Sequence, residues 1–206
     1  MLDNKGFDMW ADGYDLSVGL SDDDNSYPFA GYKDVLGTIC AGVAAKAPCR
    51  VLDIGFGTGV LTAKLYEAGC EVYGQDFSAR MTALARTRMP GAVLVQGDFS
   101  QGLAEELKRR RYDAIVATYS LHHLEDDMKV PFIRSLRELL NEGGELWIGD
   151  VAFSCRAELE ACRNEYEEEW DDEEYYFVFD ELFPLLPGLE FTKISHCAGV
   201  FRLARD

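Results

Sequence analysis

The chain has 206 residues, a hydrophobic fraction of 48% and a formal net charge of −17 at pH 7. Its length suits one domain with a full core, and no apolar run approaches the roughly 18 residues that a membrane span needs. An acidic surface disfavours nucleic acid, since binding it requires a basic surface that releases counterions.

Other features of the composition favour a cytoplasmic protein. The six cysteines are scattered without a C-x-x-C pair, which is typical of reduced thiols, and the first residues lack the pattern of a secretory signal. The one basic cluster, at 108–111, is interpreted as the end of a predicted helix over 101–111, because cations complement a helix C-terminus. No membrane or nucleic-acid partner is therefore expected.

Residues 1–47 precede the first core strand, and their pattern predicts two short helices joined by a polar turn at 22–28. The first helix carries the aromatic residues Phe7, Trp10 and Tyr14. The second, over about 32–45, has apolar residues at helical spacing, which indicates a face packed on the core. We treat residues 1–47 as part of the same domain as residues 48–206.

The central motif is a short apolar strand that ends in an acid and a glycine-rich turn, with Asp53, Gly55, Gly57 and Gly59 at alternate positions. Glycine allows positive φ and lets a ligand approach the backbone closely. A helix is predicted directly afterwards, so the turn offers free N–H groups at a helix N-terminus. A dinucleotide fingerprint would need glycine where the chain has Val60, which disfavours NAD.

Acidic residues recur at the ends of the next two strands. Asp76 ends a strand over 71–76, where a carboxylate can accept both ribose hydroxyls of a nucleoside. Ser78 can cap the helix over 79–89, which leaves Asp76 free for the ligand. After a third strand at 92–96, Asp98 and Phe99 together offer an acceptor and an apolar ring to an adenine.

A fourth strand, over 112–120, is apolar enough to be buried on both faces of a parallel sheet. It leads to His122 and His123, which are adjacent and point in different directions, so at most one is expected to face a cleft. No metal site is predicted, because a zinc site needs further ligands and the acids at 125–127 are interpreted as the first turn of a helix.

The last third of the chain begins with a helix to about Leu140, a Gly-Gly turn and a fifth strand that ends at Asp150, which either lines the cleft or caps a helix. The acidic run at 165–174 is interpreted as a solvated face rather than as a site for a cationic acceptor such as an amine. Segments 189–195 and 199–204 predict a terminal antiparallel hairpin. Together the elements predict an α/β fold, a doubly wound and mostly parallel seven-stranded sheet.

The D-x-G-x-G-x-G motif at 53–59 and the acids after the second and third strands resemble the class I S-adenosylmethionine (AdoMet) dependent methyltransferases. The resemblance covers about residue 48 to the C-terminus. The Phe-x-x-Trp-x-x-x-Tyr-Asp and His-His-Leu patterns are similar to those of small bacterial methyltransferases of unassigned substrate. The resemblance implies AdoMet as cofactor, S-adenosylhomocysteine as product, and an N-terminal helical lid over 1–47.

The same resemblance implies roles for individual residues. The glycines would lie under the methionine and ribose of the cofactor, and Asp53 would fix the turn or the cofactor amine. Asp76 would bind the ribose, and Phe77, Asp98 and Phe99 would surround the adenine. Thr118 would lie at the edge of the reaction site, and Tyr14 would either contact the cofactor from the lid or pack within the N-terminal helix.

The predicted function is methyl transfer by in-line displacement to a small-molecule acceptor, with His122 or His123 as the candidate proton acceptor. The alternative is a non-catalytic AdoMet-binding or partner-activating subunit with the same fold. The protein is expected to be a monomer or a homodimer.

Overall fold

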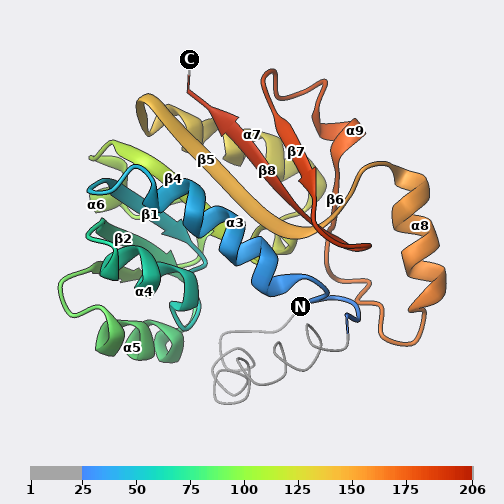
Figure 1. Ribbon diagram of the computed structural model, residues 1–206, viewed down its shortest axis with the longest axis horizontal. Coiled ribbons are helices and arrows are strands. Elements are labelled where there is room, and N and C mark those ends of the chain that lie inside the picture. The colour runs from blue at the N-terminus through green and yellow to red at the C-terminus, as the bar shows by residue number, and fades with distance from the viewer. Residues whose placement is uncertain (1–24, 206) are drawn as a thin grey trace.

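The computed structural model describes residues 25–205, which form an α/β fold around one sheet with the strand order β3-β2-β1-β4-β5-β8-β7 (Figure 1). The parallel strands are β1 (Arg50–Ile54), β2 (Glu71–Asp76), β3 (Val93–Gln96), β4 (Tyr112–Thr118) and β5 (Leu140–Phe153). The antiparallel strands are β7 (Glu190–Lys193) and β8 (Ala198–Ala204), and β8 pairs with β5. The predicted architecture is confirmed, with the short strand β6 (Phe177–Val178) added beside β5.

The chain reverses its direction across the sheet between β1 and β4. From β1 it proceeds outward to β2 and β3, and it then returns to place β4 on the other side of β1. Loops that leave two neighbouring parallel strands in opposite directions open a crevice at the carboxyl ends of those strands. The fold therefore places its binding crevice next to the glycine turn that follows β1.

Helices cover both faces of the sheet. One face carries α3 (Tyr32–Ala44), α4 (Val60–Glu67) and α5 (Ala79–Arg88), and the other carries α6 (Glu105–Lys108), α7 (Asp126–Glu138) and α9 (Phe179–Leu182). Figure 1 shows α3 crossing in front of the sheet and α7 behind it, with α8 (Arg156–Glu165) at one end. Each face has its own buried cluster, with Val35 and Ile39 of α3 in one and Ile133 and Leu136 of α7 in the other.

Two predicted elements differ from the structure. The helix predicted over 101–111 is wrong, because Gly102 has a φ of 102° and separates a 3-10 turn at Phe99–Gln101 from the short helix α6. The helix predicted to run to Leu140 ends at Glu138, and β5 begins at Leu140. Tyr14 and the predicted first helix lie outside the described residues. None of the helices within 25–205 has the length and apolarity to cross a membrane.

Candidate functional site

A cavity of about 480 Å³ lies at the carboxyl ends of the parallel strands, which is within the usual size range of small-molecule sites. It brings together most of the predicted site residues: Gly55, Gly57, Asp76, Phe77, Asp98, Phe99, Thr118, His122 and His123. Asp53 and Gly59 do not line it, and Tyr14 falls outside the described part of the chain.

The glycine turn is needed for two different contacts. Gly55 has a φ of 71°, and a Cβ there would lie 2.4 Å from Cβ of Ser120, whose hydroxyl donates to the carbonyl of Ile54 at 2.8 Å. Gly59 has a φ of 80° and precedes α4, where a Cβ would lie 2.9 Å from Cε of Met89. Gly55 therefore lets the turns after β1 and β4 meet at the cavity, while Gly59 serves helix packing away from it.

Asp53 acts inside the turn. Its side chain is buried, and its Oδ2 accepts a hydrogen bond from the hydroxyl of Thr62 in α4. Burial raises the pKa of Asp53 to about 7, the Thr62 hydrogen bond opposes this rise, and the charge of Asp76 adds to it. Of the two roles that the resemblance implies, this geometry supports fixing the turn, since the carboxyl group ties β1 to the helix that follows.

The sequence led us to expect a free Asp76, but its carboxylate has hydrogen-bond partners within the protein. Its Oδ2 accepts from the backbone N–H of Gly57 at 2.8 Å, and its Oδ1 accepts from the N–H of Ser78 at 2.8 Å. Ser78 also caps α5, as predicted, because its hydroxyl accepts from the N–H of Met81 at 3.1 Å. Asp76 therefore holds the glycine turn and also lines the cavity, and a carboxylate has about four acceptor positions.

The neighbouring residues give this end of the cavity the chemistry that a nucleoside requires. Asp98 and Phe99 line the cavity beside Phe77, and the Asp98 carboxylate accepts from the N–H of Ser100 at 2.8 Å. Two carboxylates can accept hydrogen bonds from hydroxyl and amino groups, and the two phenyl rings offer apolar faces to a planar base. The residues present therefore fit the adenosine part of AdoMet.

The two histidines form the other end of the cavity. Residues Leu121–His123 make a 3-10 turn, and both imidazole rings line the cavity with their centroids 4.2 Å apart. The expectation that at most one histidine would face the cleft is wrong, because the turn brings both rings to the same side. His122 Nδ1 lies 2.6 Å from Oδ1 of Asp150, and its Nε2 lies 3.4 Å from Oε1 of Glu174.

These contacts give the two histidines different charge states. Burial disfavours a charge on His122, but the carboxylates of Asp150 and Glu174 outweigh it and raise the pKa of His122 to about 10. Burial and the charge of His122 lower the pKa of His123 to about 4. At neutral pH, His122 is an imidazolium and His123 is neutral. Asp150 is thus a partner of His122 rather than a cavity residue or a helix cap.

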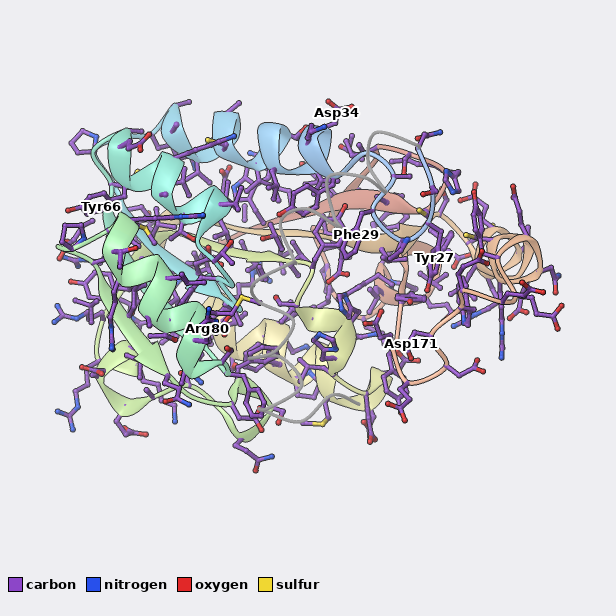
Figure 2. All side chains as sticks on the ribbon, turned by 90° about the horizontal axis from the view of Figure 1, so that it is seen from below. Tyr27, Phe29, Asp34, Tyr66, Arg80 and Asp171 are labelled. Carbon is purple, nitrogen blue, oxygen red and sulfur yellow. The ribbon has the colours of Figure 1, made fainter. Side chains whose placement is uncertain are left out.

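The acidic run contributes residues that the sequence interpretation missed. Glu169 and Asp171 are exposed, as the interpretation of the run as a solvated face expects, but together with the partly buried Glu174 they also line the cavity. Figure 2 shows Asp171 near Tyr27, and the backbone N–H of Asp171 donates to the Tyr27 hydroxyl at 3.4 Å. The available signal was the change from acidic residues to the aromatic residues at 175–177, which marks the point where the run enters the core.

Two backbone contacts hold this acidic segment against the histidine turn. The N–H of Tyr175 donates to the carbonyl of His122 at 2.8 Å, and the ammonium of Lys129 donates to the carbonyl of Tyr175. Lys129 is buried although it is charged, and it also donates to Asp126 at 2.8 Å. The position of Glu174 beside His122 therefore depends on α7 as well as on its own segment.

A ligand atom from each of His122, His123 and Glu174 lies within 4.8 Å of the others, and no other group of this kind occurs within 25–205. Both ring nitrogens of His122 already face carboxylates. A metal-bound histidine must be neutral, whereas these two contacts favour the protonated ring. We interpret His122 and Glu174 as an ion pair that lies beside the neutral ring of His123.

Comparisons with known proteins agree with this geometry. Residues 51–144 match a family model described as a methyltransferase domain. An uncharacterized methyltransferase of Geobacillus sp. (strain WCH70) is 39% identical over 194 residues, which cover 90% of this chain and 88% of the relative. Another, from Geobacillus thermodenitrificans, is 38% identical, with 90% and 87% covered.

Solved structures share the fold at low identity. A complex of DhpI with S-adenosylhomocysteine superposes with a TM-score of 0.70 and 19% identity, and covers 97% of this chain and 93% of that one. Magnesium protoporphyrin IX methyltransferase from Synechocystis PCC 6803, also with S-adenosylhomocysteine bound, gives a TM-score of 0.67 and 19% identity, with 86% and 85% covered.

Proposed function

The chain belongs to this family of methyltransferases and is an AdoMet-dependent enzyme, and from that premise we propose that it methylates a small-molecule acceptor held beside its histidine pair. The observation that carries the proposal is a single cavity with two chemically different ends. One end has the carboxylates and rings that suit a nucleoside. The other has an imidazolium, a neutral imidazole and three carboxylates.

The cofactor-binding residues of the proposal are those at the first end of the cavity. The glycine turn at Gly55 and Gly57 lets the backbone approach the ligand, and Asp76 accepts hydroxyl groups of the ribose. Asp98 accepts the adenine amino group between Phe77 and Phe99. Thr118, the last residue of β4, also lines the cavity, and we assign it to the edge of the place where the methyl group is transferred.

AdoMet supplies a methyl group on a sulfonium, so that the acceptor's lone pair forms the new bond while the carbon–sulfur electron pair stays on sulfur. The protein's task is then to align the acceptor, which must also lose its proton. His123 has the neutral imidazole, which can accept a hydrogen bond from the acceptor and align it, while its pKa of about 4 leaves the proton itself to solvent. His122 already carries a proton, and it instead orients Glu174 and Asp150.

A small acceptor is supported by the volume of the cavity, which must hold both the acceptor and the cofactor. Among the proteins of similar fold, one is named for magnesium protoporphyrin IX and another, NodS from Bradyrhizobium japonicum, is named an N-methyltransferase. The first name gives a porphyrin and the second gives only the kind of atom that is methylated, so the acceptor of this chain has to be inferred from its own residues.

The test is calorimetry of AdoMet, S-adenosylhomocysteine and NADH with the wild-type protein, Asp76→Asn and the surface control Asp127→Asn. We expect micromolar AdoMet affinity in the wild type and the control. The asparagine at position 76 weakens charge-assisted hydrogen bonds of about 1.5–3 kcal/mol each, so its affinity should fall at least tenfold. Undiminished affinity, or binding of NADH alone, contradicts the proposal.

A non-catalytic AdoMet-binding subunit would pass this binding test but would produce no S-adenosylhomocysteine with any acceptor. Turnover therefore separates the two functions. The second end of the cavity favours the enzyme, because a subunit that only senses the cofactor has no use for an imidazole beside it.

A further inference from the structure

The acceptor end of the cavity is built by a continuous chain of hydrogen-bonded side chains. Tyr27 and Tyr176 are joined through their hydroxyls, and the Tyr176 hydroxyl donates to Oε2 of Glu174 at 2.8 Å. The other oxygen of Glu174 faces Nε2 of His122, whose Nδ1 reaches Asp150. Since both oxygens of Glu174 have partners within the protein, its carboxylate has a defined place in the cavity wall.

Among the described residues, carboxylates outnumber cations at this end of the cavity. Glu169, Asp171 and Glu174 line the cavity, while the only cation among its described lining residues is His122, which is shared with Asp150. In the described chain, neither Glu169 nor Asp171 forms an ion pair with a lysine or arginine. Burial and the charge of Glu174 raise the pKa of Asp171. This repulsion between like charges would be relieved by a bound cation.

Aromatic rings complete this end of the cavity. Tyr27 stacks on Trp170 with centroids 5.1 Å apart and meets Tyr176 edge to face at 6.0 Å. On the other wall, Tyr119 packs on Phe29 at 5.4 Å. All of these rings except Trp170 line the cavity. The faces of aromatic rings attract ammonium groups, and this attraction is strongest where water is excluded.

We propose that the acceptor is a cationic amine whose ammonium group binds between Glu174 and Asp171 against the tyrosine rings. The inference rests on the proposed function and specifies its substrate class. An anionic acceptor would be repelled by the three carboxylates, and a neutral alcohol would gain hydrogen bonds from them but no ion pair.

The chemistry of transfer to such an acceptor is balanced with solvent as the proton acceptor. The ammonium first loses one proton to solvent, the neutral imidazole of His123 accepts a hydrogen bond from the resulting amine, and the nitrogen lone pair then forms the bond to the methyl carbon. The carbon–sulfur pair stays on sulfur, and the product is a methylated ammonium. Glu174 and Asp171 favour both the charged substrate and the charged product.

The experiment uses three probes of similar shape that differ in charge: phenethylamine, 2-phenylethanol and phenylacetate. Each is titrated at pH 7.5 into the protein saturated with S-adenosylhomocysteine, so that no turnover occurs. The variants are Glu174→Gln and Asp171→Asn, and the matched control is Glu168→Gln. Glu168 is exposed in the same acidic run and does not line the cavity.

We expect phenethylamine to bind at least tenfold more tightly than the other two probes. This preference should fall at least tenfold in Glu174→Gln, fall in Asp171→Asn, and persist in Glu168→Gln. Equal binding of the three probes, no binding of any, or an equal loss in the control overturns the amine inference. Failure of S-adenosylhomocysteine itself to bind would instead refute the proposed function, so the two failures are distinguishable.

Discussion

The pairing of His122 with Asp150 makes the stability of the fold depend on pH. Relative to the ordinary value of 6.5, the pKa of His122 rises to about 10 in the folded protein. At 1.36 kcal/mol per pKa unit, this rise corresponds to about 5 kcal/mol. The folded state binds the proton more tightly, so this stabilisation is fully present below pH 6.5 and is lost as the pH rises through 10. The lowered pKa of Glu174 reflects part of the same interaction, so its free energy is not added to the roughly 5 kcal/mol.

The substitution Asp150→Asn tests this reasoning, because it removes the charge and keeps an oxygen that can accept from the N–H of Val151. We expect the variant to lose about 3–5 kcal/mol of unfolding free energy at pH 6, as when one partner of a buried ion pair is removed. At pH 10 the loss should be much smaller, since His122 is then half neutral in the wild type.

The assay is urea denaturation followed by tryptophan fluorescence at pH 6, 8 and 10, with Asp127→Asn as the surface control. An equal loss of unfolding free energy at pH 6 and pH 10 would refute the role of a charged His122. The chain has three histidines, so their NMR titrations give a direct second measurement. His122 should titrate well above the ordinary histidine value of 6.5 in the wild type and move toward that value in Asp150→Asn.

Two further predictions concern the turn and the acidic segment. Gly55→Ala should lower the unfolding free energy by about 2–4 kcal/mol in urea denaturation, because its Cβ meets Ser120 and its φ is positive. The control Gly37→Ala, in α3 with open space around it, should raise that free energy by up to about 1 kcal/mol; equal effects would contradict the argument. Lys129→Met removes the donor to the Tyr175 carbonyl, so calorimetry should show weaker phenethylamine binding, roughly tenfold, with AdoMet affinity unchanged. Unchanged phenethylamine affinity would show that Lys129 does not position the segment.

Much of the fold was accessible from local patterns. The central strands β1 and β4 are short apolar runs because they are buried on both faces, and the turn after β1 is rich in glycine because two loops meet there. The ends of β2 and β3 carry Asp76 and Asp98, which the topology must place at the same edge of the sheet. The local pattern did not predict the structure at 101–111. Most residues there favour a helix, but the backbone is not helical at Gly102.

The roles within the site required contacts between distant segments. The sequence identified both histidines as candidates, but their different charge states arise from Asp150 and Glu174, which come from β5 and from the acidic run. Asp53 carried the expected motif, yet its carboxyl points to Thr62 instead of the cavity. In the same way, most of the acidic run is exposed, as the sequence indicated, but only the structure shows that three of its residues also line the cavity.

The sequence by itself therefore determined the class of fold, the glycine turn and the carboxylates at the strand ends. Strand burial, turn conformation and strand order can be inferred from residue types at neighbouring positions in the chain. Only the tertiary structure decided which histidine is charged and what the acceptor end is made of. A pKa depends on burial and on charges within a few ångströms, and folding brings those charges together from segments that have no local relation.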